Sequence, residues 1–191
     1  RTNTWLSQNY DSQYAFIGMG QHSLSNLYPV LDYLHIPLKY VCVTSDNKAK
    51  LITQKLRSTK GTTSVDEILK DNSIKGVFVS VSPSAHFEIA KKVLNSGKSL
   101  FIEKPPCKTL DELIELIDMQ HKHGSPIVVV GMQKRYSPII GILYKRLKKE
   151  KMVSYNLRYL AGAYPEGVAL TDLYIHPLDI VTYLFGGAKL I

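Results

Sequence analysis

The feature that most constrains this chain is the alternation of short apolar runs with helical patterns through its first 131 residues. The runs are continuous rather than alternating in polarity, which is typical of strands covered by helices on both faces. Strands that alternate with helices at short spacing indicate a parallel sheet. We therefore expect an α/β protein whose first domain, residues 13–131, is a doubly wound parallel sheet. The expected strands cover residues 14–17, 40–43, 76–81, 100–102 and 127–131.

The character of the sequence changes after Gly131. A polar loop leads to a basic amphipathic helix over 139–149, then to a predicted strand over 153–160 and a predicted helix over 171–185. We expect residues 132–191 to form part of a second, α+β domain. A lone strand leaves its ladder groups unpaired, so the pattern also predicts that the chain is a fragment of a longer protein.

Composition excludes several classes of protein. No apolar run approaches the roughly 20 residues that span a bilayer, so no membrane partner is expected. The net charge is +8, but the densest basic run, 145–151, closes a helical pattern and no nucleic-acid-binding motif accompanies it. Cys42 and Cys107 match no metal-ligand spacing, and a reducing, cytoplasmic location is the simplest inference.

A glycine turn directly follows the first predicted strand. Gly18 permits a tight turn, and Gly20 lets the backbone approach a pyrophosphate at the N-terminus of the following helix, next to Gln21 and His22. Ser23 occupies the position where a third glycine usually allows close packing of helix and strand. The alternative is an ordinary turn, but the strand–turn–helix context favours dinucleotide binding.

The end of the second predicted strand bears on the choice of cofactor. An acidic residue there would bind the ribose hydroxyls of NAD. Thr44 and Ser45 stand there instead, with Asp46 slightly later and Lys48 close by. Hydroxyls and a cation favour the 2′-phosphate of NADP, although these residues could simply begin the next helix, with Asp46 or Asn47 as its N-cap.

Two further strand ends fall on the same edge of the predicted sheet. Ser82 and Pro83 would line the cofactor crevice, and His86 follows in the first turn of a helix, where a structural role is the alternative. The segment 101–106 passes from an apolar run into Glu103, Lys104 and two prolines, so pairing should stop there. A lysine held at such an edge is a candidate for acid–base work, against the simpler interpretation of a surface ion pair.

The predicted helix over 171–185 carries Asp172 and His176, four residues apart and hence on one face. A carboxylate near an imidazole can orient it and raise its basicity, which suits proton abstraction from an alcohol. A buried structural hydrogen bond is the alternative. No third ligand stands at a recognisable spacing, so we expect no metal site.

Taken together, these motifs resemble the Gfo/Idh/MocA family of oxidoreductases, the glucose–fructose oxidoreductase and inositol dehydrogenase group. The resemblance covers about residues 14–187. It rests on the segments 16–20, 82–86, 97–105 and 131–138, and on Asp172, His176 and Asp179.

The resemblance implies a Rossmann domain that binds NAD or NADP, and a sugar, polyol or related substrate held against an antiparallel sheet in a second domain that also forms the oligomer. It implies that Lys104 holds the reacting oxygen, that His176 is the general acid/base, and that Asp172 binds substrate or orients His176. Glu103 would line the nicotinamide end of the cofactor site. The segment after 160 is shorter than the family requires, which again predicts a truncated second domain.

We therefore expect an NAD(P)-dependent oxidoreductase, acting on a sugar-like hydroxyl or ketone and forming a homo-oligomer at full length. A non-catalytic dinucleotide-binding sensor on the same fold is the alternative. A third hypothesis, a nucleic-acid-binding domain, is supported by the net charge alone.

Overall fold

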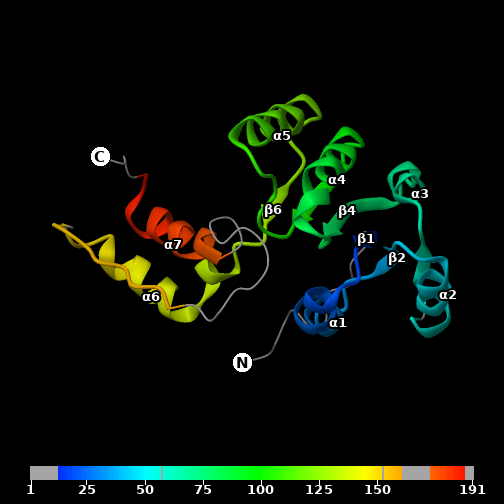
Figure 1. Ribbon diagram of the computed structural model, residues 1–191, viewed down its shortest axis with the longest axis horizontal. Helices are drawn as coiled ribbons and strands as arrows, with labels where there is room; N and C mark the ends of the chain where they lie inside the picture. Colours follow the sequence, from blue (N-terminus) through cyan, green and yellow to red (C-terminus); the bar gives the residue numbers. More distant parts are fainter. Residues whose placement is uncertain (1–12, 57, 152, 161–172, 188–191) are drawn as a thin grey trace. The chain divides into compact units, whose positions relative to one another are not determined.

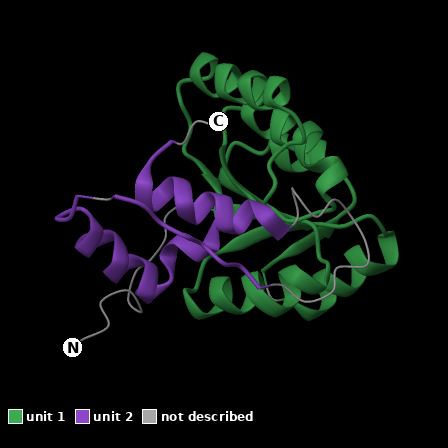
Figure 2. Cartoon of the chain, turned by 60° about the vertical axis from the view of Figure 1, so that its left-hand side comes forward, with its two compact units in different colours: residues 1–130 green, residues 131–191 purple. Residues whose placement is uncertain are grey.

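The computed structural model describes residues 13–56, 58–151, 153–160 and 173–187. The chain divides into two compact units, residues 1–130 and 131–191, which Figure 2 colours separately. Among the described residues, no helix is long and apolar enough to cross a membrane.

The first unit is built around one parallel sheet (Figure 1). Its strands are β1 (Gln13–Ile17), β2 (Leu38–Cys42), β3 (Lys60–Thr62), β4 (Ile74–Val79), β5 (Ser99–Ile102) and β6 (Val128–Val130). They lie in the order β3-β2-β1-β4-β5-β6, and every pair is parallel. The predicted Rossmann-type doubly wound sheet is thus confirmed, and its topological switch point lies between β1 and β4.

Helices cover both faces of this sheet. They are α1 (Tyr28–Tyr33), α2 (Asp46–Lys55), α3 (Val65–Lys70), α4 (Pro83–Asn95) and α5 (Leu110–Lys122). Phe16 and Val41 pack with residues of α1 and α2, whereas their strand neighbours Ala15, Ile17 and Cys42 pack with residues of α3, α4 and α5. Successive strand residues therefore enter different cores, which explains why the strands are apolar without alternation.

β3 was not expected from the sequence, because Lys60-Gly61-Thr62 contains no apolar run. It pairs with β2 and lies close against α2. A Cβ added at Gly61 would lie 2.0 Å from the carbonyl oxygen of Ala49 in α2. Glycine is therefore required for this close approach.

The helical segment after the glycine turn is less regular than its sequence predicts. The helical spacing of Leu24, Leu27, Val30, Leu31 and Leu34 predicts one apolar face, but Leu24 and Val30 are about half exposed. A π-helical turn over Ser23–Leu27 (η2), closed by the Tyr28 N–H donating to the Ser23 carbonyl, precedes α1. Its extra residue rotates the later positions, and Pro29, which lacks an N–H, follows directly.

Two Ser/Thr-x-x-Glu patterns in the sequence, Ser64 to Glu67 and Thr109 to Glu112, predict capping boxes, and they mark the starts of α3 and α5. The Thr109 hydroxyl accepts from the Glu112 N–H at 3.2 Å and the Glu112 carboxylate accepts from the Thr109 N–H, which completes the predicted capping box of α5. Ser64 caps α3 in the same way, but Glu67 turns its carboxylate to Lys60 and Thr62 instead. The predicted box of α3 is therefore only half formed.

The described part of the second unit contains a short 3₁₀ helix, η3 (Gln133–Tyr136), and two helices, α6 (Pro138–Leu147) and α7 (Ile175–Phe185). The strand predicted over 153–160 is wrong, because these residues join no β-ladder. Their alternating pattern has no strand to pair with in the described chain, and Tyr155 stacks on Phe185 at a ring separation of 4.3 Å instead.

Candidate dinucleotide site

A pocket of about 620 Å³ opens at the switch point, where the carboxyl ends of the strands meet. Its walls come from the ends of β1, β2, β3 and β4. The predicted cofactor residues that line it are Gly18, Gly20, Gln21, His22, Thr44 and Ser82. The predicted residues Ser45, Pro83, His86, Glu103 and Lys104 lie outside its lining.

Glycine is suited to the two positions of the turn, 18 and 20, for different physical reasons. Gly18 has φ +103°, and a Cβ there would lie 2.0 Å from the carbonyl oxygen of Ser80. Both the backbone conformation and the contact with β4 therefore require glycine. A Cβ at Gly20 would meet no described atom within 4 Å. Gly20 thus leaves an open approach to the backbone at the start of the helical segment.

Ser23 replaces a third glycine without loss of packing. Its side chain is fully buried, and its hydroxyl lies 3.0 Å from the Ser80 hydroxyl and 3.5 Å from the Ser80 carbonyl oxygen. The helical segment is therefore fixed to the end of β4 by hydrogen bonds. Ser80 was missed in the sequence because it is 57 residues from Ser23 and ends an ordinary apolar strand.

The ribose end of the pocket is formed by the ends of β2 and β3. Thr44, Lys48 and Thr63 line it. Asp46 is outside the lining, and its carboxylate accepts a hydrogen bond from the Thr63 hydroxyl at 3.0 Å. Ser45, not Asp46 or Asn47, is the N-cap of α2. Thr63 was missed because the strand before it carries no apolar signal.

The turn after β5 is connected to the glycine turn. Glu103 is mostly buried, and its carboxylate lies 3.3 Å from the Nε2 of His22, a residue of the pocket wall. The Glu103 N–H donates to the Val79 carbonyl at 2.9 Å, which continues the β4–β5 ladder by one step. Lys104 follows directly, half-buried, and its peptide bond to Pro105 is cis. The pairing stops here, as the sequence predicts.

His86 is placed differently from the other predicted cofactor residues. It is 1% exposed. Its Nδ1 lies 2.6 Å from the Pro105 carbonyl oxygen, and its Nε2 lies 3.1 Å from the Val81 carbonyl oxygen. The structural alternative considered for this residue therefore agrees with its burial, whereas a direct contact with a ligand in the pocket does not.

The catalytic candidates of the second unit are only partly described. Asp172 lies outside the described residues. His176 is buried in the first turn of α7. One turn later, Asp179 accepts a bidentate ion pair from Arg135 of η3, with 2.8 Å between the Arg135 Nε and each carboxylate oxygen. This pair fixes η3 to the helix that carries His176.

The described residues contain no group of three or more His, Cys, Asp or Glu side chains that could hold a metal ion. Burial raises the pKa of the Cys42 thiol and of the Cys107 thiol, so both stay protonated near neutral pH.

The pocket fits a dinucleotide. The open backbone at Gly20 and the N-terminus of the helical segment suit a pyrophosphate, and the polar groups at the ends of β2 and β3 suit a ribose. The pocket also extends from the glycine turn to Ser82 and Ala85 across the switch point. The site can thus hold an extended, phosphate-containing ligand along the edge of the sheet.

Comparison with known proteins agrees with this geometry. The Gfo/Idh/MocA family model, described as "Oxidoreductase family, NAD-binding Rossmann fold", matches residues 12–132. An uncharacterized oxidoreductase of Schizosaccharomyces pombe is 34% identical over 110 residues, which cover 55% of this chain and 29% of that protein. The inositol 2-dehydrogenase of Salmonella typhimurium is 26% identical over 129 residues, which cover 62% of this chain and 37% of that enzyme.

Among solved structures, an oxidoreductase from Bacillus cereus matches with a TM-score of 0.73 and 26% identity, over 92% of this chain and 53% of that one. The chain thus spans about half, or less, of the length of these proteins. The family model covers well over half of the 191 residues. This chain therefore belongs to the Gfo/Idh/MocA family of oxidoreductases with an NAD-binding Rossmann fold.

Proposed function

We propose that the protein is an NAD(P)-dependent oxidoreductase that transfers a hydride between nicotinamide and a hydroxyl or ketone of a sugar, polyol or related substrate. The observation that carries the proposal is the pocket at the switch point, with Gly18 and Gly20 on its wall and the Glu103-Lys104 turn tied to it through His22. The inositol 2-dehydrogenase relative supports a polyol-like substrate.

Within this function, we favour NADP over NAD. Lys48, Thr44 and Thr63 line the ribose end of the pocket, whereas the Asp46 carboxylate is outside the lining and accepts from the Thr63 hydroxyl. A cation and hydroxyls suit a 2′-phosphate, and a carboxylate in that position would repel it.

The residues would divide the chemistry as follows. A bound nicotinamide would supply the hydride chemistry. Lys104 would donate a hydrogen bond to the reacting oxygen and stabilise the negative charge that develops there. His176 would take the hydroxyl proton in the oxidation direction and return it in reduction, and Asp172 would bind substrate or orient the imidazole. The Arg135–Asp179 pair would hold the helix that carries His176.

Binding and turnover test the proposal separately. Titration calorimetry with NADP⁺ and NAD⁺ should show binding of at least one of them, with NADP⁺ the tighter. Turnover is then measured with myo-inositol and a panel of sugars. Lys104→Met and His176→Ala should each keep cofactor binding and lose turnover. If neither NADP⁺ nor NAD⁺ binds, the proposal is refuted.

The second candidate is a non-catalytic sensor that binds the dinucleotide and a protein partner. It is supported by the same pocket but needs neither Lys104 nor His176. If both variants leave a cofactor-dependent partner interaction unchanged and no substrate of the panel turns over, the sensor is favoured.

We also propose a cytoplasmic location and assembly into a homo-oligomer. The first is supported by two free cysteines, one of them buried, and the second by the family resemblance alone. Cell fractionation and light scattering on the purified protein test them.

A further inference from the structure

One buried imidazole joins the two turns at the ends of β4 and β5. The ring of His86, in the first turn of α4, lies between the carbonyl oxygen of Val81 on one side and that of Pro105 on the other, at 3.1 Å and 2.6 Å. Val81 belongs to the wall of the dinucleotide pocket, and Pro105 directly follows Lys104. The ring is almost completely buried, so it is closed to a ligand in the pocket.

We propose that His86 is a positioning residue that fixes the turn carrying Lys104, and not a residue that contacts the cofactor. The proposal rests on the proposed function only for the role of Lys104 in hydride transfer. Its structural part depends on His86, Val81 and Pro105 alone.

Two further contacts hold the residue before Lys104. The Glu103 N–H donates to the Val79 carbonyl at 2.9 Å, and the Glu103 carboxylate faces His22 and the Lys104 N–H. His86 holds the residue after Lys104. The backbone on either side of the lysine is therefore attached to β4 or its following turn, and the two attachments together fix where the lysine side chain starts.

Each carbonyl oxygen faces one ring nitrogen of His86 and accepts a hydrogen bond when that nitrogen carries a proton; a neutral imidazole donates from one nitrogen and an imidazolium from both. A carbonyl oxygen only accepts hydrogen bonds, so a replacement must bring N–H donors. The asparagine amide places its nitrogen near the Nδ1 position, toward Pro105. The longer glutamine amide places its nitrogen near the Nε2 position, toward Val81. The two amides thus separate the contact with the lysine turn from the contact with the pocket wall.

The first experiment observes Lys104 directly. The full chain is reductively methylated with ¹³C-formaldehyde, and the Lys104 dimethylamine signal is assigned by its loss in Lys104→Arg. We expect His86→Gln to shift or broaden this signal and His86→Asn to leave it near the wild-type position. Ser96→Ala is the matched control, since the Ser96 hydroxyl donates to the Val93 carbonyl at the far end of the same helix. An unchanged Lys104 signal in a folded His86→Gln protein overturns the proposal.

The second experiment separates positioning from cofactor contact. A displacement of about 1 Å can cost on the order of 100-fold in rate, so His86→Gln should lower kcat by about that factor, with the Kd for NADP⁺ within about twofold of wild type. His86→Asn should recover most of kcat. A large rise in Kd with kcat unchanged would show a cofactor contact and overturn the proposal.

Failure of the proposed function gives a different result. A wild-type protein that binds neither NADP⁺ nor NAD⁺ refutes the function, whereas the Lys104 signal in the His86 variants still decides whether His86 holds the turn.

Discussion

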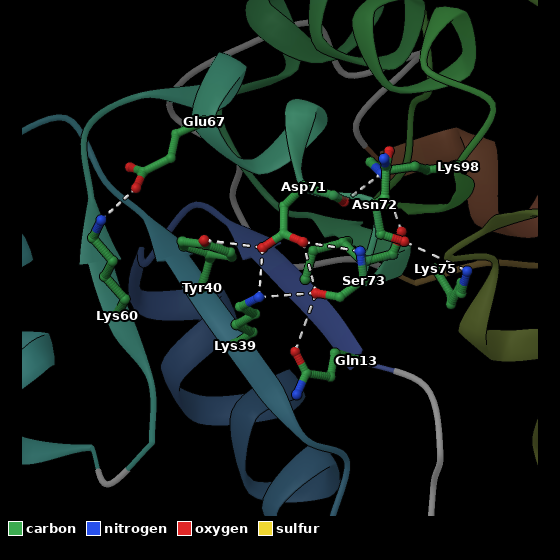
Figure 3. Close-up of polar contacts among 11 residues, drawn as sticks. Gln13, Lys39, Tyr40, Lys60, Glu67, Asp71, Asn72, Ser73, Lys75 and Lys98 are labelled. Atoms are coloured by element: carbon green, nitrogen blue, oxygen red, sulfur yellow. Dashed lines mark hydrogen bonds and ion pairs between the residues drawn. The ribbon is translucent and has the colours of Figure 1, made fainter.

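Polar residues have opposite roles at the amino ends and at the carboxyl ends of the strands, here called the amino edge and the carboxyl edge of the sheet. At the amino ends of the strands, Asp71 is the centre of a closed network (Figure 3). Its carboxylate accepts from the Lys39 ammonium at 2.6 Å, the Tyr40 hydroxyl at 3.0 Å and both the N–H and hydroxyl of Ser73 at 2.9 and 2.7 Å. Its backbone carbonyl accepts from the buried Lys98 at 2.8 Å.

At the carboxyl ends, the backbone at Gly20 faces open space and Lys48 lines a pocket of about 620 Å³. The difference shows how one sheet provides both a stable base and a binding edge. Polar groups that satisfy one another at the amino edge hold β2, β4 and β5 in register. Those at the carboxyl edge are arranged around a space that a ligand can fill.

The largest effect is expected at Gly18, which lines the pocket at the carboxyl edge and also packs closely against the end of β4. Gly18→Ala places a Cβ 2.0 Å from the Ser80 carbonyl oxygen at φ +103°. We expect the free energy of unfolding to fall by about 3 kcal/mol and NADP⁺ binding to be lost. Urea denaturation and calorimetry measure the two quantities.

Gly20→Ala is the matched control. Since its Cβ meets no described atom, the free energy of unfolding should change by less than about 0.5 kcal/mol, while NADP⁺ affinity falls on the order of tenfold. Equal destabilisation by both substitutions would contradict the different roles assigned to the two glycines.

At the amino edge, Lys98→Met should have the next largest effect. Lys98 is 6% exposed, and its ammonium donates to the carbonyl oxygens of Asp71 and Ile74 at 2.8 and 3.1 Å. Burial lowers its pKa. Removing the donor takes one hydrogen bond from each of these carbonyls, although the Asp71 carbonyl still accepts from the Ile74 N–H at 3.2 Å. We therefore expect a loss of about 2 kcal/mol in urea denaturation, with cofactor affinity unchanged.

Lys75→Met provides the comparison, because the Lys75 ammonium is exposed and makes a long hydrogen bond, 3.5 Å, to the Asn72 carbonyl oxygen. Its effect on unfolding should stay below about 0.5 kcal/mol. If Lys98→Met unfolds at the same urea concentration as Lys75→Met, the amino edge does not stabilise the sheet as described.

A smaller and selective effect is expected at Lys48. Lys48→Ala should weaken NADP⁺ binding about tenfold and leave NAD⁺ binding unchanged, because only the 2′-phosphate would contact the ammonium. Lys50→Ala, in the same helix but outside the pocket, controls for net charge. An equal loss for both cofactors would refute the assignment of Lys48 to the 2′-phosphate.

The smallest effect is the pH dependence at Asp71. Hydrogen bonding from Lys39, followed by Ser73, holds the pKa of the Asp71 carboxyl well below its usual range. The folded protein then binds fewer protons than the unfolded chain, so this contribution to stability is present at neutral pH. It is lost as the pH falls from about 5 through the usual aspartate pKa of about 3.9 toward the lower folded-state value.

Asp71→Asn should therefore melt below wild type at pH 7, and the difference should shrink on acidification. Thermal melts between about pH 7 and pH 3 measure it. A difference that stays constant with pH would show that the Asp71 charge does not stabilise the amino edge.

The sequence predicts the parts of this molecule that depend on local pattern. Continuous apolar runs locate β1, β2, β4, β5 and β6, and the box at Thr109 marks the start of α5. Where the local pattern is weak or ambiguous, prediction fails. β3 has no apolar residue to mark it, and the alternation over 153–160 belongs to a segment without a ladder partner in the described chain.

The candidate site follows the same division. The rule that ligands bind at the carboxyl ends of parallel strands brings Gly18, Thr44 and Ser82 to one pocket. Contacts between distant residues are not visible in the sequence. The Ser23–Ser80 pair and the position of His86 between two backbone carbonyls both depend on the tertiary packing of elements that local patterns treat separately.

The Ser23–Ser80 pair has a consequence for how such sequences can diverge. The two buried hydroxyls satisfy each other at 3.0 Å. Replacing one alone leaves the other without this partner at a cost of about 1–3 kcal/mol, whereas replacing both by small apolar residues can be nearly neutral. Positions 23 and 80 should therefore change together among close homologues, with serine in both or in neither.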